Sequence, residues 1–126
     1  MQNEWNDNQP IYRQLRERVI GLILDGILDE DDALPSVRNV SSEYRVNPIT
    51  VSKAYQTLVD EELVVKKRGL GMFVCKGAKE ILLESEKKKF LESEWPDIMS
   101  RIKRLGLSSS ELLSLEVVSN EENSDG

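Results

Sequence analysis

The sequence predicts a mainly α-helical fold with one small β-hairpin, and three observations within its 126 residues support this. Apolar residues recur at steps of three and four over most of residues 10–60, which is the period of an amphipathic helix. Residues 63–75 change to two short apolar runs around a glycine-containing turn, as expected of a hairpin. From residue 78 the helical period returns, so helices are expected on both sides of the hairpin.

The first helix is expected to start near Pro10, because the fixed φ of proline suits the first helical position. It carries one apolar stripe, formed by Ile11, Leu15, Val19, Leu22, Ile23 and Ile27. The stripe ends in four consecutive acidic residues, 29–32, which lack the alternating ligand spacing and the glycine of a calcium loop. We therefore expect an exposed turn there.

Two short helices joined by a tight turn follow. Ser36 is a good N-cap for a helix over residues 37–44. Asn47 as N-cap and Pro48 at the first helical position begin the next helix, which is expected to end near Asp60. Its expected buried face consists of Val51, Ala54, Tyr55 and Leu58.

A hairpin and a helical tail complete the predicted fold. The strands are expected at residues 63–67 and 72–75, which makes residues 9–77 a winged helix-turn-helix DNA-binding domain. Residues 78–118 are expected to form a short all-α dimerisation tail, and residues 119–126 a disordered end.

The tail contains an apolar a/d seam of about two heptads. Its members are Leu91, Trp95, Ile98, Ile102 and Leu105. Too little chain follows the seam to bury it, so we expect it to meet its twin in a second copy. Pro96 lies inside the seam and predicts either a kink or a helix restart capped by Ser93. A capping box of Ser108 and Glu111 predicts a last helix that runs to about Val117.

The composition excludes several function classes. The chain has no histidine, which removes the usual general base and the commonest transition-metal ligand. It also has no glycine-rich phosphate loop, so we expect no enzyme, no metal and no cofactor. The single cysteine, Cys75, excludes an internal disulfide. No apolar run reaches the roughly 18–20 residues that cross a bilayer, and no signal peptide pattern is present, so we expect a cytoplasmic protein without membrane contact.

The charge is divided unevenly along the chain. The formal net charge is −6, which by itself argues against a nucleic-acid partner. Residues 36–77, however, carry seven basic and four acidic side chains, a net charge of +3. Attraction to phosphate depends on the potential within a Debye length of about 8–10 Å, so the charge of this segment matters more than the total.

Residues 26–74 resemble the DNA-binding domain of the GntR superfamily of bacterial transcription regulators. Residues 34–38, LPSVR, match the family's LPS-x-R motif, residues 47–56 resemble its recognition helix, and residues 68–74 resemble its wing. The opening of the first helix, QPIYRQL, together with a tail of about 50 residues that contains LGLS before its last helix, is similar to the YtrA-type subfamily.

The resemblance implies a homodimeric, sequence-specific regulator that binds double-stranded DNA at a two-fold operator site. Members are usually repressors, often of an adjacent transporter operon, and the effector of this chain stays unknown. The alternative is a winged helix that binds protein as an adaptor. An adaptor has no need for basic residues on the recognition surface, so the charge of residues 36–77 favours DNA.

The expected DNA-binding residues lie on three segments. Asn47, Ile49, Ser52 and Lys53 are placed for base edges at the start of the recognition helix, with Lys53 suited to guanine and Gln56 to adenine. Ile49 stands where the family usually has asparagine, and its apolar side chain is suited to a thymine methyl.

The other expected contacts involve phosphate and the minor groove. Ser36 and Thr50 offer hydroxyls to phosphate, and Arg38 is expected to hold phosphate or reach into the groove, with an ion pair to Glu43 as the alternative. On the wing, the expected minor-groove residues are Lys67, Arg68, Gly69 and Gly71. The alternative there is that the lysines protect the edge strand from pairing.

Two residues depart from the family's glycine pattern. Asp31 stands where a glycine is usual in the acidic turn, and Glu62 stands where a glycine usually precedes the first wing strand. Because a residue with a side chain seldom adopts a positive φ, we expect Glu62 to destabilise its turn.

Overall fold

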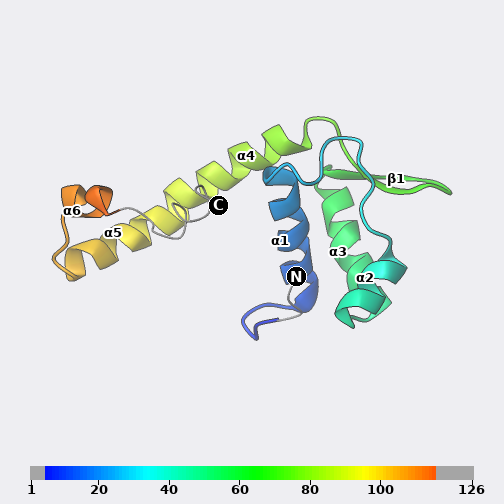
Figure 1. The fold of residues 1–126 in the computed structure, drawn as a ribbon, viewed down its shortest axis with the longest axis horizontal. Coiled ribbons are helices and arrows are strands. Elements are labelled where there is room, and N and C mark those ends of the chain that lie inside the picture. Colours follow the sequence, from blue (N-terminus) through cyan, green and yellow to red (C-terminus); the bar gives the residue numbers. More distant parts are fainter. Residues whose placement is uncertain (1–4, 116–126) are drawn as a thin grey trace, which may run out of the picture. The chain divides into compact units, whose positions relative to one another are not determined.

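The computed structural model describes residues 5–115 and consists of two compact units, residues 1–85 and residues 86–126. Figure 1 labels the α-helices and the first strand of the chain.

Three helices form the framework of the first unit (Figure 1). They are α1 (Ile11–Leu24), α2 (Val37–Tyr44) and α3 (Pro48–Asp60), and both α1 and α2 pack against α3. The antiparallel strands β1 (Val64–Lys67) and β2 (Gly71–Val74) follow as a hairpin. The structure therefore confirms the predicted fold class, which is mainly helical with one small hairpin.

The core of the first unit is built around α3. Val51, Ala54 and Leu58 are fully buried and Tyr55 is 1% exposed, which confirms the predicted buried face. The predicted caps are also confirmed, since the Ser36 side chain accepts a hydrogen bond from the N–H of Asn39. The turn between α2 and α3 passes through Arg45, whose left-handed φ of 55° ends α2.

The end of α1 differs from the prediction. Pro10 precedes the first helical residue, and α1 ends at Leu24 because Gly26 adopts a φ of +80°. Ile27 was expected on the apolar stripe, but it lies beyond the helix and is 66% exposed. The stripe therefore contributes Leu15, Val19 and Ile23 to the core, and the prediction that Ile27 continues the helical stripe is wrong.

The short segment that leads into α2 pairs with β2 beside the hairpin. The N–H of Leu34 donates to the carbonyl of Met72 over 2.8 Å, and Ala33 forms a bridge with Phe73. This pairing was not predicted from the sequence. Its consequence is that the residues leading into α2 are fixed beside β2.

Two non-glycine residues at the predicted departures have positive φ. Asp31 has a φ of 71° and Glu62 has a φ of 63°. The conformation expected for Glu62 is thus confirmed, and Asp31 shares it. Both sit in turns where a glycine would carry no Cβ penalty.

The helix α4 (Ala78–Lys89) begins in the first unit, where Ala78 and Leu82 are buried in the core. A π-helical turn, η1 (Phe90–Glu94), and the helix α5 (Trp95–Arg104) follow in the second unit. The N–H of Trp95 donates to the carbonyl of Phe90, five residues earlier. This turn accommodates Pro96, which lacks an N–H. The alternative of a restart capped by Ser93 is wrong, because α5 begins after Glu94 without a side-chain cap.

The last described helix is α6 (Ser109–Ser114), and its capping box between Ser108 and Glu111 is confirmed. It ends at Ser114, followed by Leu115 in an extended conformation, so the predicted end near Val117 is wrong. The segment 119–126, expected to be disordered, lies outside the described residues. No helix in the described part of the chain combines the length and apolar character needed to span a bilayer.

Candidate nucleic-acid interface

One groove in the first unit collects residues from the start of α2, the exposed side of α3 and the hairpin. Its volume is about 450 Å³. Six of the predicted DNA-binding residues line it, and these are Ser36, Ser52, Gln56, Lys67, Gly69 and Gly71. Residues that are far apart in the sequence therefore share one recess.

The other predicted contact residues do not line this groove. They are Arg38, Asn47, Ile49, Thr50, Lys53 and Arg68. All are exposed except Thr50, which is half-buried. Their accessibility is compatible with contact to a ligand as large as a duplex, but the groove itself does not bring them together.

The wall of the groove at α2 is held by Tyr55. Its hydroxyl donates a 2.6 Å hydrogen bond to the carbonyl of Pro35. Burial, followed by the influence of Tyr44, raises the pKa of Tyr55 to about 12, so its hydroxyl remains a donor at neutral pH. Ser36 follows directly, and because its oxygen accepts from a backbone N–H, its own O–H remains available as a donor.

The recognition helix begins with a self-capped turn. The Asn47 side-chain oxygen accepts a 2.8 Å hydrogen bond from the N–H of Ile49, which leaves the two amide donors of Asn47 available. Ile49 is 76% exposed. An apolar side chain with this exposure at the start of α3 fits the predicted contact with a thymine methyl.

Two residues of α3 have partners within the chain. The Gln56 side-chain amide donates a 2.9 Å hydrogen bond to Asp60, which uses one of its two N–H donors. The second N–H and the carbonyl oxygen are the groups that a bidentate contact to adenine needs. The ammonium of Lys53 lies 4.2 Å from the centroid of the Tyr12 ring, in α1. Tyr12 was not predicted from the sequence as a site residue, although it lies within the QPIYRQL motif that resembles the subfamily.

The wing is a tight turn whose tip carries one basic and one apolar side chain. The N–H of Leu70 donates to the carbonyl of Lys67 over 2.9 Å, and Gly69 has the positive φ of 76° that this turn requires. Arg68 is exposed, and Leu70 is 74% exposed. The ammonium of Lys67 lies 4.7 Å from the Phe73 ring, which keeps its charge near the hairpin.

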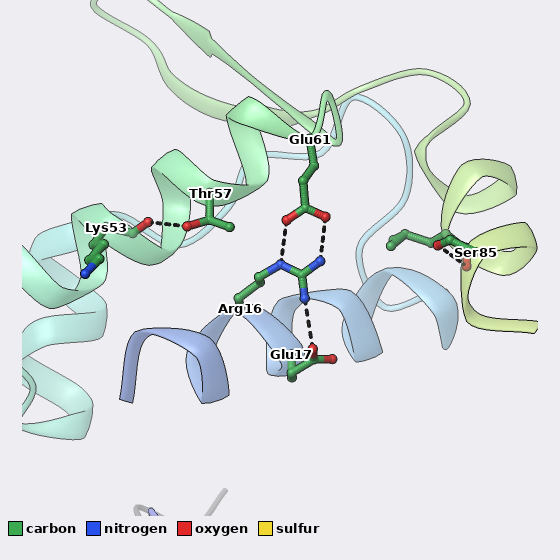
Figure 2. A network of polar contacts seen from close by, with 7 residues as sticks. Arg16, Glu17, Lys53, Thr57, Glu61 and Ser85 are labelled. Atoms are coloured by element: carbon green, nitrogen blue, oxygen red, sulfur yellow. Dashed lines mark hydrogen bonds and ion pairs between the residues drawn. The ribbon is translucent and has the colours of Figure 1, made fainter. Parts of the chain in front are cut away.

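An ion pair links α1 to the end of α3. Figure 2 shows the Arg16 guanidinium between two carboxylates, with two bonds to Glu61 and one to Glu17. The bond from Nε to Glu61 is 2.7 Å. Arg16 is therefore neutralised, whereas Arg38 and Arg68 form no ion pair in the part of the chain that the structure describes.

The second unit contains an apolar surface. Of the predicted seam, Leu91 and Leu105 are more than 60% exposed, Trp95 and Ile98 are nearly 40% exposed, and Ile102 is half-buried. Trp95 and Ile102 also line a recess of about 450 Å³ with Leu112 and Leu113 of α6. Among residues 5–115, no three histidine, cysteine, aspartate or glutamate side chains gather in a way that would hold a metal ion.

Comparison with known families finds one match. The family model described as bacterial regulatory proteins, gntR family, matches residues 11–74, just over half of the chain. Over 77 residues the chain is 40% identical to the HTH-type transcriptional repressor YtrA of Bacillus subtilis. That match covers 61% of this chain and 59% of YtrA, so the chain spans less than two thirds of this relative.

Two solved structures resemble the fold. A GntR family transcriptional regulator from Listeria monocytogenes superposes with a TM-score of 0.71 at 28% identity, covering 87% of this chain and 95% of that one. The DNA-binding domain of AraR, solved in complex with operator ORX1, superposes with a TM-score of 0.53 at 26% identity. The latter covers 60% of this chain and 92% of the AraR domain.

Proposed function

Since this chain belongs to the gntR family of bacterial regulatory proteins, we propose that it is a transcription regulator and not an enzyme. We propose that it is a repressor that binds a two-fold operator in duplex DNA as a homodimer. We further propose that residues 9–77 bind the DNA, that residues 78–118 join the two copies, and that a transporter operon is the target.

The groove between α2, α3 and the hairpin carries this proposal. Six predicted contact residues line it, and between them these residues carry hydroxyl, amide, ammonium and glycine backbone groups. Such groups bind phosphate oxygens and base edges in DNA interfaces. The AraR domain, which has the same fold, was solved with an operator, and this supports the assignment of DNA as the ligand.

The repressor role and the homodimer have separate support. The chain resembles YtrA, which is described as a repressor. The seam residues Trp95 and Ile98 are each nearly 40% exposed within one chain, although both are large and apolar. Pairing with a second copy would bury them, and it would place two recognition helices on one two-fold site.

A titration with matched variants tests the proposal. Fluorescence anisotropy of a labelled operator, obtained by in vitro selection, is measured against the full chain at several salt concentrations. The logarithm of the affinity should fall with the logarithm of the salt concentration, with a slope of about −0.9 for each phosphate contacted.

The variants separate the interface from a general loss of charge. Arg68→Ala, on the wing, should weaken binding. Lys79→Met removes one positive charge beside the acidic turn of Asp29, Glu30 and Asp31, and it should leave the affinity unchanged. A wild-type affinity that is the same for selected and unrelated duplexes, in the range of about 10⁻⁴ to 10⁻⁶ M, would refute the proposal and favour the protein adaptor.

A further inference from the structure

The ring of Tyr12 brings two basic side chains together from different helices. The Lys53 ammonium, from α3, lies 4.2 Å from the ring centroid, and the guanidinium carbon of Arg13, from α1, lies 5.8 Å from it. A cation within about 6 Å of an aromatic centroid is attracted to the ring. We refer to Tyr12, Arg13 and Lys53 as the Tyr12 cluster.

The two cations of the Tyr12 cluster carry charge that no carboxylate neutralises. Neither Arg13 nor Lys53 forms an ion pair within residues 5–115, and both are exposed. Arg16, one turn further along α1, is by contrast held by two glutamates (Figure 2). An ammonium has three N–H donors, and a contact with one ring face leaves donors free on the opposite side.

The contact of Lys53 also separates it from the groove. Its neighbours on the same face of α3, Ser52 and Gln56, line the groove, whereas Lys53 does not. Its ammonium lies against α1 instead. The sequence predicts that Lys53 donates to a guanine edge. In the structure its ammonium lies against Tyr12, and the two positions compete for the same side chain.

We propose that the Tyr12 cluster binds a backbone phosphate of the DNA duplex, and that Tyr12 is a positioning residue for Lys53. This inference rests on the proposed function. It assigns Lys53 to a contact that fixes the protein on the DNA and carries no sequence information. Tyr12 acts by restricting the side chain of Lys53 before DNA binds, so that less side-chain freedom is lost in the complex.

The first test distinguishes a phosphate contact from a base contact. The full chain and Lys53→Met are titrated against the selected operator, against operators with single base-pair changes, and against an unrelated duplex. A phosphate contact predicts that Lys53→Met weakens binding by the same factor on every duplex and reduces the magnitude of the salt slope by about 1. Lys79→Met is the charge-matched control, and its slope should equal that of the wild type.

The result that would overturn the phosphate assignment is specific. If Lys53 reads a guanine, Lys53→Met loses affinity for the selected operator and loses the discrimination at one base pair. An unchanged salt slope on all duplexes would overturn it as well. In either case the wild-type operator complex remains intact, so the inference fails while the proposed function stands.

The second test addresses Tyr12. Tyr12→Phe keeps the aromatic face and should bind as the wild type does. Tyr12→Leu removes the face and should weaken binding by about two- to five-fold, the effect of one exposed cation–π contact. In the Lys53→Met background, Tyr12→Leu should have no further effect, because the residue that it positions is gone.

Folding is controlled independently, since Tyr12 packs against the core. Circular dichroism and thermal unfolding of each variant identify any loss of structure, and Tyr12→Met replaces Tyr12→Leu if the latter is unfolded. An equal loss of affinity from the Tyr12 substitution with and without Lys53 would overturn the positioning role. A wild-type protein that shows no preference for its selected duplex would instead refute the proposed function itself.

Discussion

The hydroxyl of Tyr55 donates a hydrogen bond of 2.6 Å to the carbonyl of Pro35, which joins the middle of α3 to the turn before α2. Pro35 and its neighbour Ser36 both line the groove, so this bond sets the position of one groove wall. Ala33 is fixed from the other side by its bridge to Phe73. The turn before α2 is thus held by both the helix and the hairpin that it faces.

Removing this hydroxyl is expected to destabilise the first unit. Tyr55→Phe keeps the buried ring and deletes one hydrogen bond, which should lower the free energy of unfolding by about 1 kcal/mol. Urea unfolding followed by circular dichroism measures this change. Tyr12→Phe is the matched control, because no hydrogen bond of its hydroxyl is present in the described structure. Equal stabilities for Tyr55→Phe and the wild type would show that the bond to Pro35 contributes nothing.

The same residue predicts a dependence on alkaline pH. The pKa of Tyr55 is raised from 10.0 to about 12, mainly by burial, so the folded state holds its proton more tightly than the unfolded state does. Stability from this group is therefore complete below pH 10 and is lost as the pH rises towards 12. Burial and Glu43 also raise the pKa of Tyr44, so Tyr55→Phe should reduce the alkaline loss without abolishing it. Denaturant midpoints of the wild type and of Tyr55→Phe, measured between about pH 9 and 12, test this. The same loss of stability with rising pH in both proteins would contradict it.

The positive φ of Glu62 predicts a stabilising substitution. Glu62→Gly removes the Cβ penalty at a φ of 63°, although glycine also gains freedom in the unfolded chain. The expected net gain is about 0.5–1 kcal/mol in the free energy of unfolding. Glu43→Gly, in the right-handed helix α2, is the control and should destabilise by about 1 kcal/mol. A loss of stability for Glu62→Gly would contradict this reading of the turn.

The ion pair between Arg16 and Glu61 predicts a salt-dependent coupling. Both side chains are partly exposed, at 20% and 39%, so solvent screens the pair, and the expected coupling energy is about 0.5–1 kcal/mol. A double-mutant cycle of Arg16→Met and Glu61→Gln measures it by urea unfolding. The coupling should fall in about 1 M salt, where charges are screened over about 3 Å. A coupling that is independent of salt would indicate that packing, not charge, joins these residues.

The seam in the second unit predicts the oligomeric state. Ile98→Asp places a charge on the proposed dimer surface and should shift the chain from dimer to monomer in sedimentation velocity experiments. The affinity for a two-fold operator should fall by at least about ten-fold, since each monomer then places only one recognition helix on the DNA. Met99→Gln is a milder control on the neighbouring residue. A monomeric wild-type protein, or a dimer unaffected by Ile98→Asp, would exclude the seam as the interface.

Local signals in the sequence predicted most of the first unit. Ser36, Asn47 and Pro48 mark helix starts through capping chemistry that involves only neighbouring residues, and the helices begin where these residues predict. The buried face of α3 follows from its periodicity in the same way. Glu62 was identified by comparison with a glycine pattern, and its backbone has the conformation that the pattern requires.

What the sequence did not predict depends on contacts between distant residues or on competition between hydrogen bonds. The bridge from Ala33 to Phe73 and the approach of Lys53 to Tyr12 join segments about 40 residues apart, and no local period encodes them. The π turn before Pro96 arises because the chain retains helical backbone angles instead of breaking. The predicted contact residues are brought together only in part, since the groove gathers six of twelve.

In vitro selection of the full chain against random duplex DNA tests most directly whether the protein is a sequence-specific repressor. A sequence-specific dimer should enrich one motif with two-fold symmetry, with half-sites about 10 base pairs apart or a multiple of that spacing. Binding of this duplex should be tighter than binding of unrelated DNA by at least about 10³-fold at physiological salt. If repeated rounds enrich no motif, and all duplexes bind with the same weak affinity, the chain is not the sequence-specific repressor proposed.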